Sequence, residues 1–164
     1  TQRTLFTQGH QGSNRITRGP NSQAFYGYNN ETTEFGFRRV RVLANGLQED
    51  EVRGGLIGGF GVDIESDSRY VYATTGSLID VETMSQVGSY PVTGIVRPDA
   101  ANGRVHFFGG GTLHTFQNAT LTNIGTLPVP NAGAALKMIR WGPDGLAFRS
   151  ATHVLLIRSG LVGG

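Results

Sequence analysis

The chain has 164 residues, of which 38% are hydrophobic and only 16% charged, with 25 glycines and a formal net charge of +2. Low charge with abundant glycine argues against disorder and suits many short strands joined by tight turns. The absence of cysteine excludes disulfides, thiolate nucleophiles and cysteine-bound metals. With a single lysine and no basic run we expect no nucleic-acid partner. No apolar stretch reaches the ~18 residues of a membrane span.

A short turn built around Asn or Asp leads into an apolar strand four times along the chain. These turns lie at residues 21–23, 67–69, 102–104 and 144–146. A recurrence of roughly forty residues made of short strands is typical of propeller blades. We therefore predict an all-β fold of antiparallel four-stranded blades in a single module spanning residues 1–164. The four repeats are expected at 13–59, 60–92, 93–135 and 136–164.

Each repeat contains short segments rich in aromatic and β-branched residues, which favour strands. First strands are predicted at 14–18, 61–65, 93–97 and 136–140, and second strands at 24–28, 69–74, 104–108 and 146–149. Third strands are predicted at 37–44, 77–81, 112–117 and 153–157, and fourth strands at 47–52, 86–91 and 121–128. The last repeat has three strands, whereas residues 1–12 contain an orphan strand at 4–7 that would complete a blade.

The number of repeats bears on how the ring closes. Four blades are few for a closed propeller, and an open ring would leave apolar blade faces bare. We expect the chain to belong to a larger propeller, completed by further blades of a parent polypeptide or by a second copy. Residues 4–7 would then pair outside the chain's own last repeat. A self-closed ring of four blades is the alternative.

The first repeat carries the clearest hairpin signal. Asn45 and Gly46 form the dipeptide most typical of a two-residue type I′ turn, which needs positive φ at both positions. This register predicts that Arg41 lies opposite Asp50 as a cross-strand ion pair. Such a pair at a sheet edge is more readily a solvated contact than part of an arginine-lined binding strip.

Two segments resemble blades of known propeller families. Residues 139–148, Ile-Arg-Trp-Gly-Pro-Asp-Gly-Leu-Ala-Phe, resemble the blade motif of bacterial WD40-like propellers, with Gly142 where a serine is usual. Residues 69–83 are similar to a blade of the YVTN family. The resemblance implies blades and no particular activity. In this motif we expect Trp141 to be buried between blades, with an exposed ligand platform as the alternative. Asp144 is expected to cap its turn by accepting a backbone N–H.

The sequence offers no metal or cofactor site. His106 and His114 flank a possible hairpin that could bring their imidazoles together, but neither they nor His10 and His153 come with a third ligand at a suitable spacing. The glycine-rich stretches at 54–61 and 109–111 match no nucleotide-binding spacing, so we expect neither a metal nor a cofactor.

Catalytic residues stay unknown at this level. No serine lies in a nucleophile elbow. The carboxylates Glu49, Asp50, Glu51, Glu65 and Asp67 lie beside predicted turns, where solvated side chains are the simpler interpretation.

Some features bear on location and ligands. Glycosylation sequons begin at Asn30 and Asn118 and favour a secreted origin. An aromatic group in the first repeat is expected to be blade core, with a carbohydrate platform as the alternative. Its members are Phe25, Tyr26, Tyr28, Phe35 and Phe37.

These observations favour a non-catalytic propeller module of a secreted or envelope bacterial protein, extracellular or periplasmic. It would be a scaffold or a platform for a protein or glycan. The alternative is an enzyme, a hydrolase or lyase, with its site in the central channel and carried by the loops at 29–34 and 99–102. Ionisable side chains from different repeats converging on one pocket would favour the enzyme.

Overall fold

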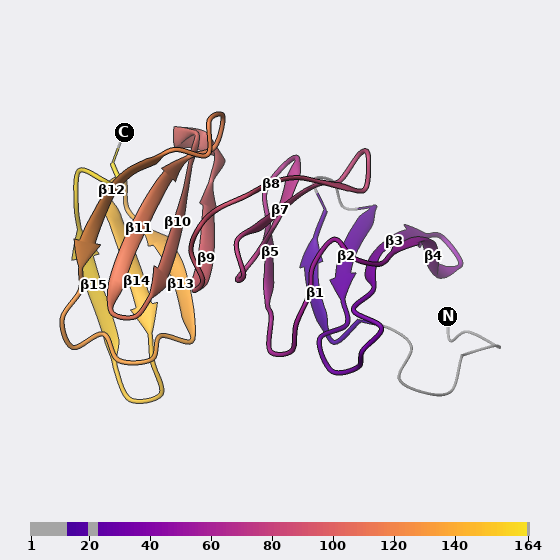
Figure 1. The fold of residues 1–164 in the computed structure, drawn as a ribbon, viewed down its shortest axis with the longest axis horizontal. Coiled ribbons are helices and arrows are strands. Elements are labelled where there is room, and N and C mark those ends of the chain that lie inside the picture. The colour runs from indigo at the N-terminus through magenta and orange to yellow at the C-terminus, as the bar shows by residue number, and fades with distance from the viewer. Residues whose placement is uncertain (1–12, 20–22, 164) are drawn as a thin grey trace. The chain divides into compact units, whose positions relative to one another are not determined.

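The structure, a computed structural model, describes residues 13–19 and 23–163, and within them the fold is all-β (Figure 1). Fifteen strands and one 3₁₀ turn make up its regular structure, with no α-helix among the described residues. The predicted fold class is confirmed. The orphan strand at residues 4–7, His10 and the turn around Asn21 lie outside the described residues.

The chain divides into two compact units. The first runs to Ala73 and also takes in Ser77–Val87, and the second comprises Thr74–Gly76 and the residues from Gly88 onward. Each unit contains two antiparallel sheets in which strands follow one another in chain order.

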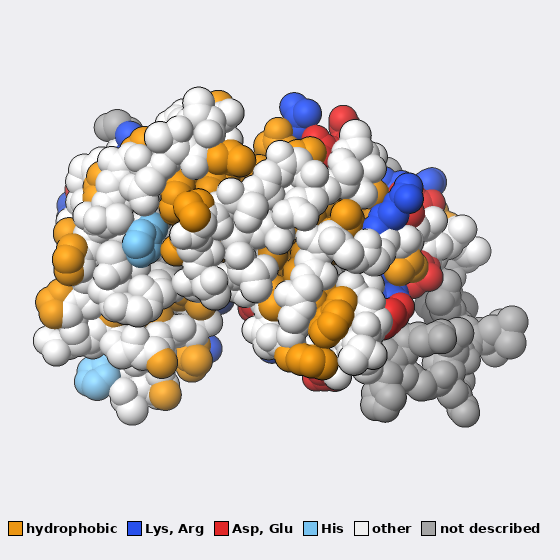
Figure 2. Space-filling view, viewed as in Figure 1, with side chains coloured by type: hydrophobic (Ala, Val, Ile, Leu, Met, Phe, Trp, Pro, Cys, Tyr) orange, Lys and Arg blue, Asp and Glu red, His pale blue; other side chains and the backbone are white. Residues whose placement is uncertain are grey.

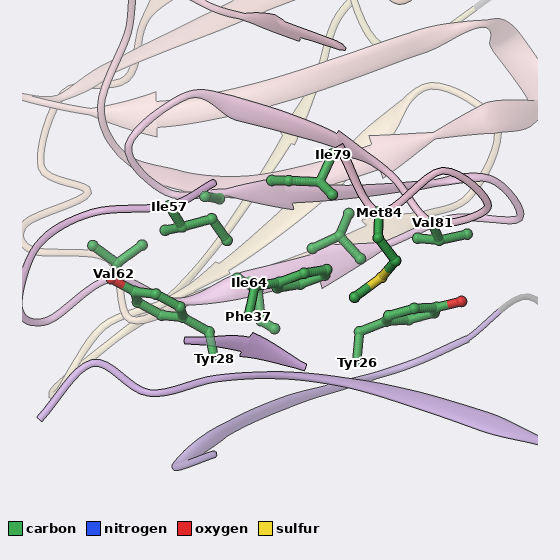
Figure 3. Packing of buried hydrophobic residues seen from close by; sticks show 11 residues of the cluster. Tyr26, Tyr28, Phe37, Ile57, Val62, Ile64, Ile79, Val81 and Met84 are labelled. Carbon is green, nitrogen blue, oxygen red and sulfur yellow. The ribbon is translucent and has the colours of Figure 1, made fainter. Parts of the chain in front are cut away.

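The first unit holds two four-stranded sheets. One consists of β1 (Arg15–Arg18), β2 (Ala24–Tyr28), β3 (Phe37–Leu43) and β4 (Gly46–Arg53). The other consists of β5 (Ile64–Ser66), β6 (Tyr70–Ala73), β7 (Ser77–Asp80) and β8 (Ser85–Ser89). Between them lies a buried apolar cluster that includes Tyr28, Phe37, Val62 and Ile79 (Figure 3). The aromatics Tyr26, Tyr28 and Phe37 are thus core, as expected.

The second unit holds one sheet of four strands and one of three. The first consists of β9 (Ile95–Asp99), β10 (Arg104–Gly109), β11 (Thr112–Gln117) and β12 (Asn123–Pro128), with a 3₁₀ turn at Ala100–Asn102. The second consists of β13 (Lys137–Trp141), β14 (Gly145–Arg149) and β15 (Val154–Arg158).

The β9–β12 sheet is buried on both faces. Phe108 packs with Phe148 and other apolar residues of the β13–β15 sheet. Phe107, next along β10, points to the other face and packs against Tyr90 and Phe116 with ring centroids 5.2 and 6.0 Å away. Both faces of this sheet therefore carry apolar side chains that pack within the second unit.

The predicted turn at Asn45-Gly46 is displaced by one residue. Leu43 pairs with Gly46, so the turn residues are Ala44 and Asn45, and neither has the positive φ that a type I′ turn requires. Arg41 pairs with Gln48 and not with Asp50, so the predicted register is wrong.

A β-bulge explains how the ion pair survives this shift. Arg39 pairs with Glu51 and Val40 with Glu49, which leaves Asp50 as the extra residue of the bulge. From there the Asp50 carboxylate reaches Arg41 diagonally, with Oδ1 2.6 Å from Nη2.

The turns at Asp67 and Asp144, which precede the second strands of their sheets, differ in the hydrogen bonds that their carboxylates accept. Asp67 accepts the backbone N–H groups of Arg69 and Tyr70 at 2.8 and 2.7 Å. The Asp144 carboxylate accepts no hydrogen bond from the described residues, so the capping prediction is wrong. The reason is position: Asp144 directly precedes β14, whose N–H groups belong to the sheet, whereas two residues separate Asp67 from β6.

Candidate functional site

Ionisable side chains from two repeats meet inside the second unit. Asp99 ends β9, His106 lies in the middle of β10, and Arg140 comes from β13 of the neighbouring sheet. An Arg140 Nη1 lies 3.3 Å from Asp99 Oδ2, and His106 Nε2 lies 3.7 Å from the same oxygen. Convergence of ionisable side chains from different repeats was the feature expected of an enzyme, so this cluster is the candidate active site.

The histidine is held by the strand beside it. Thr115 of β11 is its register partner, and the Thr115 Oγ1 lies 3.0 Å from His106 Nδ1. Nε2 makes no hydrogen bond, because 3.7 Å to Asp99 is too long. A neutral imidazole that carries its proton on Nε2, on the side of Asp99, and accepts a hydrogen bond from the Thr115 hydroxyl at Nδ1 satisfies this geometry.

Burial keeps this histidine uncharged. The low-polarity surroundings lower the pKa of His106 from 6.5 to about 4; the Asp99 carboxylate opposes that shift, and Arg140 and Arg104 add to it. A neutral imidazole is the form that could act as a base.

The order hydroxyl, imidazole, carboxylate is that of a nucleophilic triad, but this cluster is closed. Thr115 and His106 have no exposed surface, and Asp99 is 7% exposed. A nucleophile must contact the atom it attacks, so Thr115 Oγ1 cannot act in this conformation. Arg140 also donates to the carbonyl oxygens of Val162 and Pro143, each at 2.7 Å. The cluster therefore links β9, β13 and the segment after β15, which is a structural role.

The remaining histidines are separated from this cluster. His114 pairs with Phe107, one position from the His106–Thr115 pair, so the imidazoles of His106 and His114 point to opposite faces of the sheet. His153 is exposed in the turn before β15. Nowhere in the described ranges do three metal-ligating side chains come together.

The two loops proposed to carry an enzyme site belong to different units. In the first unit, Asn29 accepts the backbone N–H groups of Glu31 and Thr32, at 3.1 and 3.2 Å. Asn30 is 4% exposed, and its side-chain amide donates to the carbonyl of Val62 at 2.8 Å. The sequon at Asn30 is therefore unavailable in the folded protein. In the second unit, Asn102 donates to Asp99 at 3.0 Å and helps to close the buried cluster.

A ladder of arginines and carboxylates lies along β3 and β4, where Figure 2 shows side chains of both charges. Arg39 contacts Asp50 and Glu51 at 2.8 and 2.9 Å, and Arg38 contacts Glu34 and Glu49. Each of these arginines has carboxylate partners from its own sheet or the adjoining loop. The ladder thus holds the bulged hairpin together, and it offers no strip of unpaired cations.

The surface that stands out chemically is the outer face of the β13–β15 sheet. Ile139, Ala147 and Leu156 form a row across the three strands, and Trp141 and Val154 lie on the same face in the rows on either side. Leu156 is 50% exposed, Val154 70% and Trp141 40%. Propeller blades pack face to face, so an apolar face of this kind is what a blade presents to a neighbour.

Trp141 corrects a sequence-based prediction. It is exposed on this outer face and its ring lies under the Arg158 guanidinium, 4.7 Å from the ring centroid. The residues of β13 that alternate with Trp141 point to the opposite, inner face, where Met138 is 1% exposed. Trp141 is therefore part of a surface and not of the core between sheets.

Known structures place the fold among β-propellers. No family model and no curated protein matches the sequence. Hydrazine synthase from Kuenenia stuttgartiensis is similar over 96% of this chain and 49% of its own, with 10% identity and a TM-score of 0.69. U3-55K is similar over 95% and 52%, with 13% identity and a TM-score of 0.65. A glutaminyl cyclase from Myxococcus xanthus is similar over 88% and 72%, with 10% identity and a TM-score of 0.51.

These neighbours are β-propeller proteins, and the antiparallel sheets of this chain are propeller blades. The chain spans about half the length of the first two structures it matches. Identities of this size establish the fold alone. No helix in the described part of the chain has the length and apolar character needed to cross a membrane.

Proposed function

We propose that the chain is a non-catalytic propeller module that binds another macromolecule through the outer face of β13–β15. The observation that supports this is the contrast between the buried cluster of Asp99, His106 and Arg140 and the exposed face of the β13–β15 sheet. The converging ionisable residues are closed off, whereas an apolar face with a tryptophan is open to solvent. Aromatic and aliphatic side chains exposed together mark interaction surfaces.

The finer classification is part of the same proposal. The motifs at 139–148 and 69–83 support assignment to the bacterial WD40-like and YVTN-type propellers. An extracellular or periplasmic location is proposed on the sequon at Asn118 and the low charge, and cell fractionation tests it. A glycan ligand is the weaker choice, because the aromatics of the first sheet that it would need are mostly buried.

The enzyme is retained as a second candidate because Asp99, His106 and Arg140 converge from two repeats. It requires the cluster to open. The decisive variant is Thr115→Val, which keeps the volume of the side chain and removes the hydroxyl. If the chain hydrolyses chromogenic esters, glycosides or phosphates and Thr115→Val abolishes that turnover, the non-catalytic proposal is wrong.

Binding is tested by selection from a displayed library of random peptides. The wild-type chain serves as bait, and the double variant Ile139→Ser, Leu156→Ser serves for counter-selection. Both substitutions lie on the exposed face, so the variant should fold. We expect enrichment of peptides that bind the wild type and not the variant. Failure to enrich any such peptide would contradict the proposal.

A further inference from the structure

We propose that Asn45 is a site of spontaneous deamidation, where the folded protein converts an asparagine into aspartate or isoaspartate. The site lies in the turn between β3 and β4 of the first unit, so the inference is independent of the proposed binding face. It rests on a comparison within one chain. The sequence contains two Asn-Gly dipeptides, Asn45-Gly46 and Asn102-Gly103, each preceded by alanine, and the fold constrains only the second.

The reaction needs an accessible backbone nitrogen and an unrestrained side-chain amide. The backbone nitrogen of the glycine attacks Cγ of the asparagine, so a new C–N bond forms while the bond from Cγ to the side-chain nitrogen breaks. That nitrogen leaves as ammonia, which takes up the proton lost by the backbone N–H. Water then opens the cyclic imide at either carbonyl and gives aspartate or isoaspartate. Glycine favours the attack because no Cβ lies beside its nitrogen.

The side chain of Asn45 is unrestrained. Asn45 is exposed, and among the described residues its side chain has no hydrogen-bond partner. The next residue, Gly46, has a φ of 129°, a backbone conformation that favours glycine. The turn itself therefore places a glycine directly after an exposed asparagine, which is the combination that the reaction requires.

The tip of this hairpin also has little support from the rest of its sheet. The pairing of β2 with β3 ends at Arg41, and one further hydrogen bond joins the Val42 N–H to the carbonyl of Gln23 at 2.8 Å. Beyond that bond Leu43 pairs with Gly46 across the turn, and no other described strand pairs with these two residues. A pair at the end of a hairpin opens at little cost in free energy, and each opening releases the Gly46 nitrogen for the attack.

Asn102 is held at both reacting groups, which makes it the internal control. Its side-chain nitrogen donates to Asp99 Oδ2 at 3.0 Å. The backbone N–H of Gly103 donates to the carbonyl of Ala100 at 3.1 Å, and the Gly103 carbonyl accepts the N–H of Asn118 at 2.9 Å. The attacking nitrogen and the amide that it must reach are therefore both fixed, so the same dipeptide should react slowly here.

The test follows both dipeptides in the folded chain, incubated at mildly alkaline pH, where the backbone nitrogen loses its proton more readily. Trypsin cuts after arginine and releases the peptides 42–53 and 70–104, each with a single asparagine. Mass spectrometry of these peptides measures the replacement of the amide by a carboxyl group. We expect Asn45 to react at least about tenfold faster than Asn102. Equal rates, a faster reaction at Asn102 or no reaction at Asn45 would overturn the proposal.

The same measurement on the unfolded chain separates the fold from the local sequence. In concentrated urea both dipeptides lose their structural restraints, and their shared Ala-Asn-Gly sequence should bring the two rates within about twofold of each other. If the rates in urea differ as much as they do in the folded chain, the local sequence sets the difference and the inference is wrong.

The variant Asn45→Gln provides the matched chemical control. Its side chain is one methylene longer, so the attack by the Gly46 nitrogen would have to close a larger ring. We expect the variant to fold, since position 45 is exposed, and to lose most of the mass change in the peptide 42–53 while Asn102 keeps its wild-type rate. A mass change in that peptide that persists in the variant would overturn the assignment to Asn45.

Discussion

Acid should destabilise the second unit through His106. In the folded protein the pKa of this histidine is lowered from 6.5 to about 4, because burial disfavours the imidazolium; Asp99 counteracts the shift, and Arg140 and Arg104 add to it. The unfolded chain takes up a proton near pH 6.5, whereas the folded chain resists until about pH 4. Stability is therefore complete above pH 6.5, falls as the pH drops through this window, and levels off below about pH 4.

The magnitude follows from the gap between the two pKa values. A difference of about 2.5 units corresponds to about 3 kcal/mol in full, of which about 2.5 kcal/mol is lost between about pH 7 and pH 4.5. Urea unfolding followed by Trp141 emission reports on this unit, since the only tryptophan lies in it. The variant His106→Gln removes the titrating group while keeping an amide that can bond to Thr115.

The comparison with His106→Gln isolates the histidine from all other acid effects. We expect the stability advantage of the wild type over the variant to shrink by about 2.5 kcal/mol over that pH range. NMR titration of the imidazole should place its midpoint well below the usual 6.5. A midpoint near 6.5, or a wild-type advantage that does not depend on pH, would refute the argument that His106 is buried as a neutral base.

Two further predictions compare residues of the same type whose surroundings in the structure differ. Asp67→Ala should lower the free energy of unfolding in urea by about 2 kcal/mol, because the Asp67 carboxylate accepts hydrogen bonds from two backbone N–H groups and a tyrosine hydroxyl. Asp144→Ala at the equivalent turn should lower it by less than about 0.5 kcal/mol, and equal losses would show that the two turns are stabilised alike. Gly94→Ala should cost at least about 2 kcal/mol, because its new Cβ would clash with the carbonyl oxygen of Phe108, whereas Gly58→Ala has nothing within 4 Å and should be near neutral. The melting temperatures of both variants check this, and a Gly94→Ala variant as stable as the wild type would contradict it.

The strands were predictable because each is short, rich in β-branched and aromatic residues, and bounded by turn residues. The prediction at 112–117 matches β11 to the residue, and that at 24–28 matches β2. The hairpin failed at the level of register. The turn falls at Ala44-Asn45, so Arg41 meets Gln48 in place of Asp50. A bulge at Asp50 shifts the register again beyond Val40, and nothing in the alternation of charged and apolar residues along β4 marks where it falls.

The site was harder to predict because it depends on which face of a strand is buried. Apolar residues lie on both faces of β13, with Met138 on one face and Ile139 and Trp141 on the other. Periodicity cannot choose between two apolar faces, so Trp141 was assigned to the core. The convergence of His106 with Arg140 was also hidden, since contacts between adjacent sheets leave no spacing in the sequence. The alternation of Val154 and Leu156 was a visible signal, but it fits a core face equally well.

In the β13–β15 sheet, the residues that stabilise the fold lie on the opposite face from the proposed binding surface. Its inner face is held by Met138, Leu146 and Phe148, none more than 1% exposed, which pack with residues of the neighbouring sheet. Each such side chain contributes about 1.5–3 kcal/mol on burial. The outer residues Ile139 and Leu156 are half exposed and contribute far less to folding. Substitutions on the outer face can therefore abolish binding in a folded protein, whereas those on the inner face unfold it.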